Sequence, residues 1–154
     1  MAHKEHGTAA IDAVRAWQPP FNPAGATEEC AAWLRGYGIT RVEGDRYAGE
    51  WPREQFRAHG IHYEPARLPK SDLYLALLTY VNSGQVELPD DPRLLTELRA
   101  LERRQGASGR DRVDHPPRAH DDRANAVAGV AQAVLGRRPG VTPSDLYGES
   151  AAAI

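Results

Sequence analysis

The sequence is poor in sulfur and has few large aromatic side chains. Its 154 residues include one cysteine, one methionine, two phenylalanines and three tryptophans. Cys30 has no partner within this sequence for a disulfide bond, so we expect it to be a small core residue, as free cysteines usually are. No run approaches the roughly 20 apolar residues of a membrane-spanning helix, and residues 1–7 lack the apolar segment of a secretion signal. We therefore expect no membrane association and a cytoplasmic location.

Motifs of several common enzyme classes are also missing. The sequence contains no GxxxxGK[ST], GxGxxG, GxSxG or HExxH pattern and no pair of cysteines. These absences argue against a P-loop nucleotide site, a dinucleotide fingerprint, a hydrolase nucleophile elbow and the usual zinc sites. The net charge of −2 provides no general attraction to nucleic acid or to a membrane, so DNA binding would need a local basic surface.

The 41% hydrophobic content is sufficient for a core, and strand patterns alternate with helix patterns through the middle of the chain. The predicted strands are residues 8–17, 39–45, 61–64, 85–88 and 110–115. The predicted helices start after Thr27, at Trp51, near Ser71, after Asp91 and at Asp121, and the last one ends at Leu135. This order indicates an α/β fold with a partly parallel sheet and helices on its faces. We predict one domain over residues 1–136 and a flexible tail over residues 137–154.

Apolar spacing predicts the buried faces of the helices. The helix that we expect Thr27 to cap would bury Cys30, Ala31, Trp33, Leu34 and Tyr37. The strongest helical pattern, ending before Gly84, would bury Leu73, Tyr74, Leu77, Leu78 and Val81. The helix capped by Asp90 or Asp91 would bury Leu94, Leu95, Leu98 and Leu101. Residues 105–110 are predicted to form a flexible turn.

Asp45 lies between two glycines, Gly44 and Gly49, at the carboxyl end of a predicted strand. Sites in α/β sheets gather beyond that end of the strands, and glycine lets the backbone turn without a Cβ clash. Asp45 therefore either points into a cleft or stabilises its own turn, which is a common role of aspartate.

Asp121 and Asp122 begin an Ala-rich helix, shortly after a loop that starts at His115. A carboxylate at this position can cap the helix, because it accepts hydrogen bonds from free N–H groups and favours the positive end of the helix dipole. Two carboxylates can instead hold a divalent cation such as Mg²⁺. His115 and His120 add metal ligands or general bases nearby. From these residues alone, both interpretations stay open.

Five short motifs, in this order, resemble the C-terminal nuclease domain of phage large terminase subunits. They are GDRYAGEWPREQF at residues 44–56, KSDLYL at 70–75, NSGQVEL at 82–88, DPRLL at 91–95 and HPPRAHDDRANAV at 115–127. The resemblance covers residues 8–136. It implies an RNase H-like fold, with a mixed sheet flanked by helices, and a nuclease that cuts concatemeric phage DNA during packaging.

The resemblance also implies which residues act. Asp45 matches the family's second acidic position, and Asp121 matches the acidic residue that opens the last helix, with Asp122 as its neighbour. We therefore expect Asp45, His120, Asp121 and Asp122 to be catalytic, and the three aspartates among them to hold two Mg²⁺ or Mn²⁺ ions. Double-stranded DNA is the expected partner, with the phage portal and the small terminase subunit as further partners. The arginines expected to contact phosphates are Arg46, Arg53, Arg110, Arg112, Arg118 and Arg123.

The resemblance also implies two differences between this chain and the family. The predicted strand at residues 8–17 matches the family's second strand, so the chain is expected to lack the first strand, which carries the first catalytic aspartate, and the ATPase domain. Two acidic sites in place of three would bind Mg²⁺ weakly, and a missing strand would leave unpaired sheet edges. Two alternatives therefore stand beside the nuclease: a non-catalytic prophage remnant or DNA-packaging interaction module, and a RuvC-type resolvase.

Overall fold

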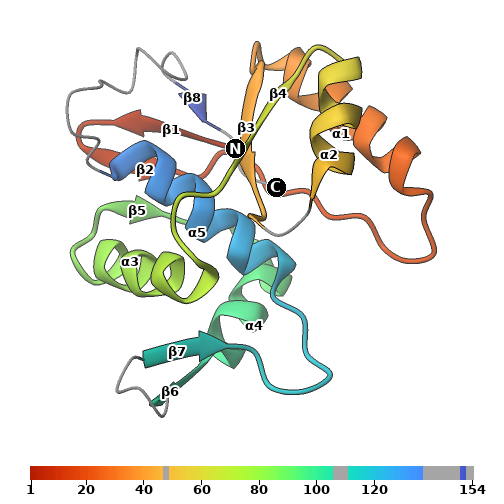
Figure 1. Cartoon of the computed structure of the whole chain (residues 1–154). Helices are drawn as coiled ribbons and strands as arrows, with labels where there is room; N and C mark the ends of the chain where they lie inside the picture. Colours follow the sequence, from red (N-terminus) through yellow and green to blue (C-terminus); the bar gives the residue numbers. More distant parts are fainter. Residues whose placement is uncertain (47–48, 106–110, 137–149, 152–154) are drawn as a thin grey trace.

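The computed structural model describes residues 1–46, 49–105, 111–136 and 150–151, and this part of the chain contains five helices and eight strands (Figure 1). The helices are α1 Pro23–Gly36, α2 Glu50–Ala58, α3 Lys70–Asn82, α4 Pro92–Ala100 and α5 Asp122–Leu135. The strands are β1 Ala2–Glu5, β2 Thr8–Ala10, β3 Arg41–Gly44, β4 His62–Pro65, β5 Val86–Glu87, β6 Glu102–Gln105, β7 Asp111–Asp114 and β8 Ser150–Ala151. None of these helices is long and apolar enough to cross a bilayer.

The strands of this part of the chain form three sheets. The largest is mixed and has the order β5-β2-β1-β8, with β2 parallel to β5 and β1 antiparallel to both β2 and β8. β3 and β4 form a parallel pair, and β6 and β7 form an antiparallel hairpin that extends away from the rest of the fold (Figure 1). The predicted α/β class with a mixed sheet flanked by helices is confirmed.

Helix α5 links the four-stranded sheet to the β3–β4 pair, because it packs against β1, β2 and β8 and also against β3. Its buried side chains are small: Ala124, Val127, Ala128, Val130, Ala131 and Val134. Small side chains let the helix approach several elements closely. Burial of each valine stabilises the fold by about 1.5–3 kcal/mol. The position of the first turn of α5 is therefore fixed by the core of the domain.

The N-terminal strand differs from the prediction. The structure has a hairpin of β1 and β2, whose turn contains Gly7 at φ 92°, and β2 ends at Ala10 and not at Trp17. After β2 the chain is held by the first residue, since the Met1 amino group donates to the Ala13 carbonyl at 2.8 Å. This hydrogen bond connects the start of the hairpin to the segment that follows it. The spacing of apolar residues in the sequence gives no indication of such a contact.

Two helix details were also predicted wrongly. Asn22, not Thr27, caps α1, because its side chain accepts from the N–H groups of Ala24 and Gly25. Thr27 lies inside the helix, where its hydroxyl donates to the Pro23 carbonyl at 2.9 Å. The Tyr37, Leu78 and Val81 side chains are exposed, although their spacing predicted burial. The spacing of apolar residues predicts which side of a helix faces the core. How many side chains on that side are buried depends on which other elements cover it.

The predictions for the other elements agree with the structure in most places. Strands 39–45, 61–64 and 85–88 overlap β3, β4 and β5, and the last helix is found as α5. β6 was missed because its four residues are polar and exposed, and they show no alternation of apolar side chains. Residues 106–110 of the turn predicted at 105–110 and residues 137–149 and 152–154 of the predicted tail lie outside the described residues. Gln105 is instead the last residue of β6, and Ser150–Ala151 form β8.

Candidate metal centre

The start of α5 is capped by a side chain from another helix. Asp121 is the N-cap residue, but its side chain makes no cap hydrogen bond. The Glu97 carboxylate on α4 accepts instead from the N–H groups of Arg123, at 2.8 Å, and Ala124, at 2.9 Å. The interpretation of Asp121 as the cap of its own helix is therefore wrong. Its carboxylate is available for other contacts.

The Asp121 carboxylate is buried and held by two polar side chains from α3. The residue is 6% exposed. Its Oδ2 atom lies 2.6 Å from the Lys70 ammonium and accepts a hydrogen bond from the Tyr74 hydroxyl at 2.7 Å. Lys70 also donates to Asp114 Oδ1 at 2.9 Å. Burial of a charge is costly unless it is paired and hydrogen-bonded, and these contacts supply both conditions.

The contacts shift the pKa of the groups that make them. Burial lowers the pKa of Lys70, but its hydrogen bonds to Asp121 and Asp114 outweigh burial and raise the pKa above its usual range. The hydrogen bond from Lys70 lowers the pKa of Asp114 against the opposing effect of burial. Burial, assisted by the hydrogen bond to Asp121, raises the pKa of Tyr74 far above its usual value. At neutral pH the cluster contains a cationic lysine, an ionised Asp114 and a neutral tyrosine.

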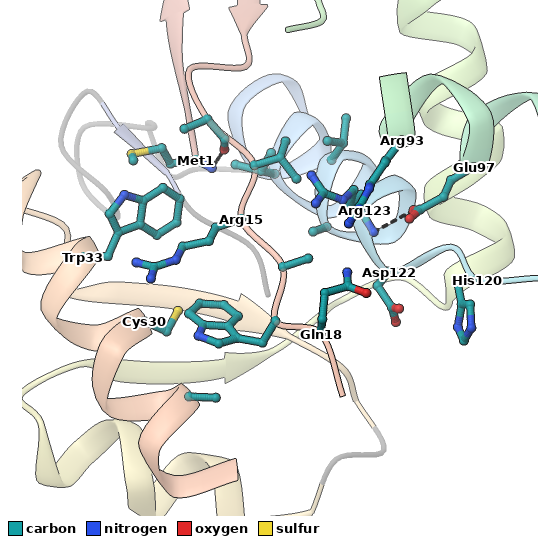
Figure 2. A pocket seen from close by; sticks show the side chains of 18 of the residues that line it. Met1, Arg15, Gln18, Cys30, Trp33, Arg93, Glu97, His120, Asp122 and Arg123 are labelled. Atoms are coloured by element: carbon teal, nitrogen blue, oxygen red, sulfur yellow. Dashed lines mark hydrogen bonds between the residues drawn. The ribbon is translucent and has the colours of Figure 1, made fainter. Parts of the chain in front are cut away.

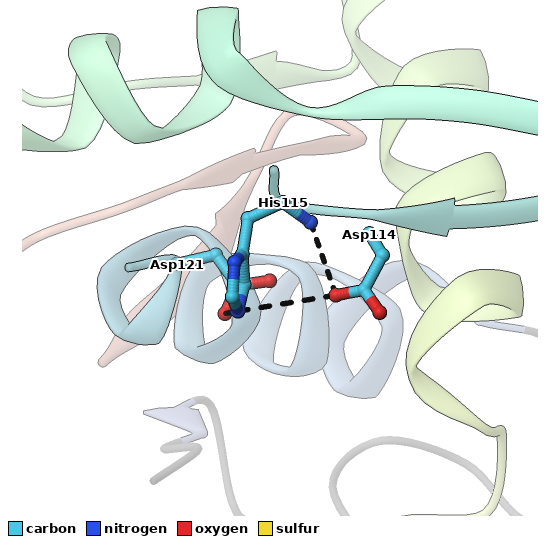
Figure 3. A group of neighbouring side chains, drawn as sticks. All are labelled: Asp114, His115 and Asp121. Carbon is cyan, nitrogen blue, oxygen red and sulfur yellow. Dashed lines mark hydrogen bonds and ion pairs between the residues drawn. The ribbon is translucent and has the colours of Figure 1, made fainter. Parts of the chain in front are cut away.

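Asp114, His115 and Asp121 form a group that could hold a metal ion (Figure 3). One ligand atom from each residue lies within 4.8 Å of the others. His115 Nε2 is 3.7 Å from Asp121 Oδ1 and 4.0 Å from Asp114 Oδ1. Two carboxylates and one imidazole suit divalent cations such as Mn²⁺, Co²⁺ or, less ideally, Mg²⁺. The chemistry of this donor set fits a divalent ion.

Asp45 lines a cavity of about 240 Å³ together with Glu43, Lys70 and Asn125. It is exposed at the end of β3, as its position after a strand predicts. The Asn125 Oδ1 atom is buried and has no hydrogen-bond partner in the structure. An unsatisfied buried oxygen in a cavity lined by carboxylates is consistent with a cation or water site there. Lys70 connects the two regions, because it lines the cavity and pairs with Asp121.

His120 and Asp122 lie in a different place from Asp121. Both side chains are exposed and line a second cavity, of about 580 Å³ (Figure 2). Its other walls come from residues 11–19, α1, α4 and α5, and Cys30 and Trp33 are among its apolar lining residues. The structure therefore separates the two adjacent aspartates: Asp121 points toward α3 and β7, and Asp122 faces the other cavity.

The predicted DNA-contacting arginines fall into two groups. Four lie at or near the surface. Arg46 donates to the Arg67 carbonyl at 3.3 Å, and Arg118 has a left-handed φ of 69°. The other two form ion pairs, Arg53 with Glu50 at 2.8 Å and Arg112 with Asp114 at 3.3 Å. Arg123 differs, because its side chain is only 14% exposed and forms an ion pair with Asp91. Its guanidinium joins α4 to α5. Arg110 lies outside the described residues.

Sequence reasoning did not single out Lys70, Tyr74 or Asp114. Asp114 directly precedes His115, which was a candidate ligand, and this adjacency was the available signal. Lys70 and Tyr74 lie in the KSDLYL motif at residues 70–75, one of the five motifs that carry the resemblance, but that motif gave neither residue a role.

The solved structures similar to this chain are nuclease domains. The large terminase nuclease from thermophilic phage G20c has a TM-score of 0.63 and 29% sequence identity, over 75% of this chain and 63% of that chain. The large terminase nuclease domain of Thermus phage P74-26 has a TM-score of 0.63 and 26% identity, over 79% of this chain and 65% of that chain. The chain thus spans less than two thirds of the nuclease domains it matches. No family model and no curated protein matches it.

The G20c nuclease has also been solved with metals. The form with bound cobalt has 28% identity and a TM-score of 0.61, over 72% of this chain and 62% of that chain. The form with bound magnesium has 28% identity and a TM-score of 0.59, over 70% and 60%. These similarities confirm the resemblance to large terminase nuclease domains and the RNase H-like fold that it implied.

Proposed function

Since the chain shares the fold of large terminase nucleases, we propose that it is the metal-dependent DNA endonuclease domain of a phage or prophage DNA-packaging terminase. The observation that carries the proposal is the placement of Asp121. The fold buries this carboxylate beside Asp114 and His115, and Lys70, which pairs with it, also lines the cavity that Asp45 lines. Carboxylates from separate elements that converge on one region are what a phosphodiester-cleaving metal site requires.

The metal would be held by Asp121 and Asp45, with Asp114 and His115 as further donors and Asn125 Oδ1 facing the same cavity. The magnesium and cobalt forms of the G20c nuclease support Mg²⁺ or Mn²⁺, with two ions as the mechanism we expect. When bound, such ions activate water and stabilise the charge that develops on a phosphodiester. The catalytic roles predicted for His120 and Asp122, and metal binding by Asp122, stay predictions, because both side chains line the other cavity.

Two residues around the site orient the Asp121 carboxylate. Tyr74 donates to Asp121 Oδ2 and fixes the rotamer of that carboxylate. Glu97 caps α5 and leaves the Asp121 side chain free to point inward. Both contacts preorganise the ligand, and preorganised groups need little rearrangement at the moment of reaction.

Double-stranded DNA is the proposed substrate. Arg46, Arg53, Arg112 and Arg118 lie at or near the surface and supply positive charge for phosphate contacts. Of the other two candidates, Arg123 supports the α4–α5 contact, and Arg110 lies outside the described residues. The phage portal and the small terminase subunit are the partners proposed from the resemblance, in the cytoplasm of a bacterial host.

A plasmid-nicking assay with Mn²⁺ tests the proposal. We expect the wild-type chain to nick supercoiled DNA, and Asp45→Asn and Asp121→Asn each to reduce the rate about 100-fold or more, as loss of a charge-stabilising group does. Asp90→Asn, an exposed aspartate outside the site, is the matched control and should cut normally. Absence of cutting by the wild type, or cutting that neither substitution affects, would contradict the proposal.

A second candidate is a non-catalytic DNA-packaging interaction module. The observation in its favour is the ion pairing of Asp114 and Asp121 with Lys70, which neutralises part of the charge a metal needs. The melting temperature distinguishes the two candidates. A site that binds Mn²⁺ gains about 2.7 kcal/mol at a hundredfold excess over Kd, whereas a module without a site gains nothing. A RuvC-type resolvase would differ from both by preferring branched over linear DNA.

A further inference from the structure

The ammonium of Lys70 lies between two of the proposed metal ligands. The Lys70 ammonium lies 2.6 Å from Asp121 Oδ2 and 2.9 Å from Asp114 Oδ1. These two carboxylates supply two of the three ligand groups in the Asp114–His115–Asp121 cluster. A divalent ion and this ammonium would therefore compete for the same pair of side chains.

The origin of the three groups makes the contact specific. Lys70 is the first residue of α3, Asp114 is the last residue of β7, and Asp121 is the N-cap of α5. Three elements meet at one ammonium, so the contact is not a product of local sequence. The Lys70 side chain is also 36% exposed and lines the cavity that contains Asp45. A flexible four-carbon stem with an open side can withdraw its ammonium without unfolding.

We propose that Lys70 is a tethered competitor of the divalent cation: it holds Asp114 and Asp121 when no metal is bound, and it leaves them when metal binds. The inference rests on the proposed function, because it concerns the regulation of the same site. Two consequences follow. The ammonium stabilises two close carboxylates that would otherwise repel each other, and it sets a threshold concentration of divalent ion for occupancy of the site.

The charge balance gives the direction of the effect. With Lys70 in place, the two carboxylates and the ammonium have a net charge of about −1. Without the ammonium, the same two carboxylates present about −2 to an incoming dication. Removal of the lysine charge therefore strengthens metal binding, whereas loss of a positioning residue would weaken it.

Calorimetric titration of the DNA-free chain with Mn²⁺ tests the inference. We expect Lys70→Met to lower the Kd for Mn²⁺ about tenfold, which corresponds to about 1.4 kcal/mol, and Lys70→Arg to stay near wild type because the cation is retained. Lys4→Met is the matched control, since Lys4 is the other lysine and is exposed on β1. The double variant Lys70→Met with Asp121→Asn should lose the gain, which assigns it to this site.

A Kd in Lys70→Met that equals or exceeds the wild-type value would overturn the inference. Lys70→Gln provides a second test if Lys70→Met fails to fold, because the amide still donates a hydrogen bond but has no charge; it too should bind Mn²⁺ more tightly. Failure of the proposed function has a different signature, namely no cleavage of DNA at any Mn²⁺ concentration. The two failures are therefore distinguishable, since one is measured as metal affinity and the other as DNA cutting.

Discussion

The Glu97 side chain on α4 caps the start of α5, although Asp121 is the N-cap residue of that helix. The Glu97 carboxylate accepts two main-chain hydrogen bonds there, and the Asp121 carboxylate turns inward to Lys70 and Tyr74. The inward direction of the candidate ligand is therefore coupled to a contact between two helices, and several measurable properties depend on it.

Glu97→Ala should destabilise the fold. The substitution removes the acceptor of two N–H groups in the first turn of α5, and loss of a cap costs about 0.5–2 kcal/mol. Urea denaturation should show this loss as a lower midpoint. Glu54→Ala on α2 is the control, since Glu54 is exposed, and it should change the unfolding free energy by less than about 0.5 kcal/mol. Equal effects of the two substitutions would show that Glu97 is not the cap.

Tyr74→Phe should be more costly than Tyr80→Phe. Both substitutions remove one phenolic hydroxyl on α3, but the Tyr74 hydroxyl donates to a buried carboxylate at 2.7 Å and the Tyr80 hydroxyl donates to the Gln132 amide at 2.9 Å. A hydrogen bond to a charged group contributes about 1.5–3 kcal/mol, and one between neutral groups about 0.5–1.5 kcal/mol. Chemical denaturation of both variants measures the difference. The reverse order would mean that Asp121 gains little from its contact with Tyr74.

Asp91→Asn should show a pH-dependent loss of stability. Burial raises the pKa of Asp91, but the hydrogen bond from the Leu94 N–H and the charge of Arg123 together lower it below its usual value of about 3.9. A lowered folded-state pKa means that the stabilisation is fully present above about pH 3.9 and is lost as the pH falls through the folded-state value.

Asparagine keeps the cap at Asp91, because its side-chain oxygen still accepts from N–H groups. The substitution therefore removes the charge together with the oxygen that accepts from Arg123. Unfolding free energies measured at pH 7 and below pH 3.9 should show a deficit of the variant at pH 7 that shrinks at the lower pH. A deficit that is constant with pH would show that the charge of Asp91 does not stabilise the fold.

Gly44→Ala should disturb the end of β3. A Cβ at this position would lie 2.5 Å from the Tyr63 hydroxyl oxygen and 2.6 Å from its ring, and Tyr63 is buried and donates to the Asp45 carbonyl at 3.0 Å. Overpacking of this kind costs about 1–3 kcal/mol. Thermal denaturation should detect the loss. Gly36→Ala, at a position where a Cβ meets nothing within 4 Å, should be neutral or slightly stabilising.

Some of the fold could be predicted because its signals are local. Asp91 followed by Pro92 predicts the start of α4, and the structure shows Asp91 as a side-chain cap with the proline in the first turn. The strand at residues 39–45 was predicted as a short strand that ends in a turn, and the structure has β3 at Arg41–Gly44. By contrast, β6 is exposed and polar, and it forms only because β7 returns beside it. Its existence depends on pairing and not on the character of its own residues.

Part of the candidate site could also be predicted, because short local motifs carry the resemblance. The resemblance marked Asp45 and the Asp121–Asp122 pair, and in the structure Lys70 pairs with Asp121 and lines the same cavity as Asp45. The resemblance could not distinguish the role of Asp121 from that of Asp122. Two adjacent residues at a helix start differ in role only through the elements that pack around each of them. Lys70 and Tyr74 were not identified because their role depends on tertiary contacts with Asp121.

Helix α5 joins the four-stranded sheet to the β3–β4 pair and has Asp121 as its N-cap, and this arrangement has a consequence for the order of folding. The Tyr74–Asp121 contact spans 47 residues of chain, and the Lys70–Asp114 contact spans 44. Loops of that length cost entropy to close, and closure must precede any stabilisation from the contact. The cluster should therefore appear late in folding, after the central helix has docked. A peptide that contains only α5 and its preceding loop would carry Asp114, His115 and Asp121 but not the arrangement that brings them together with Lys70.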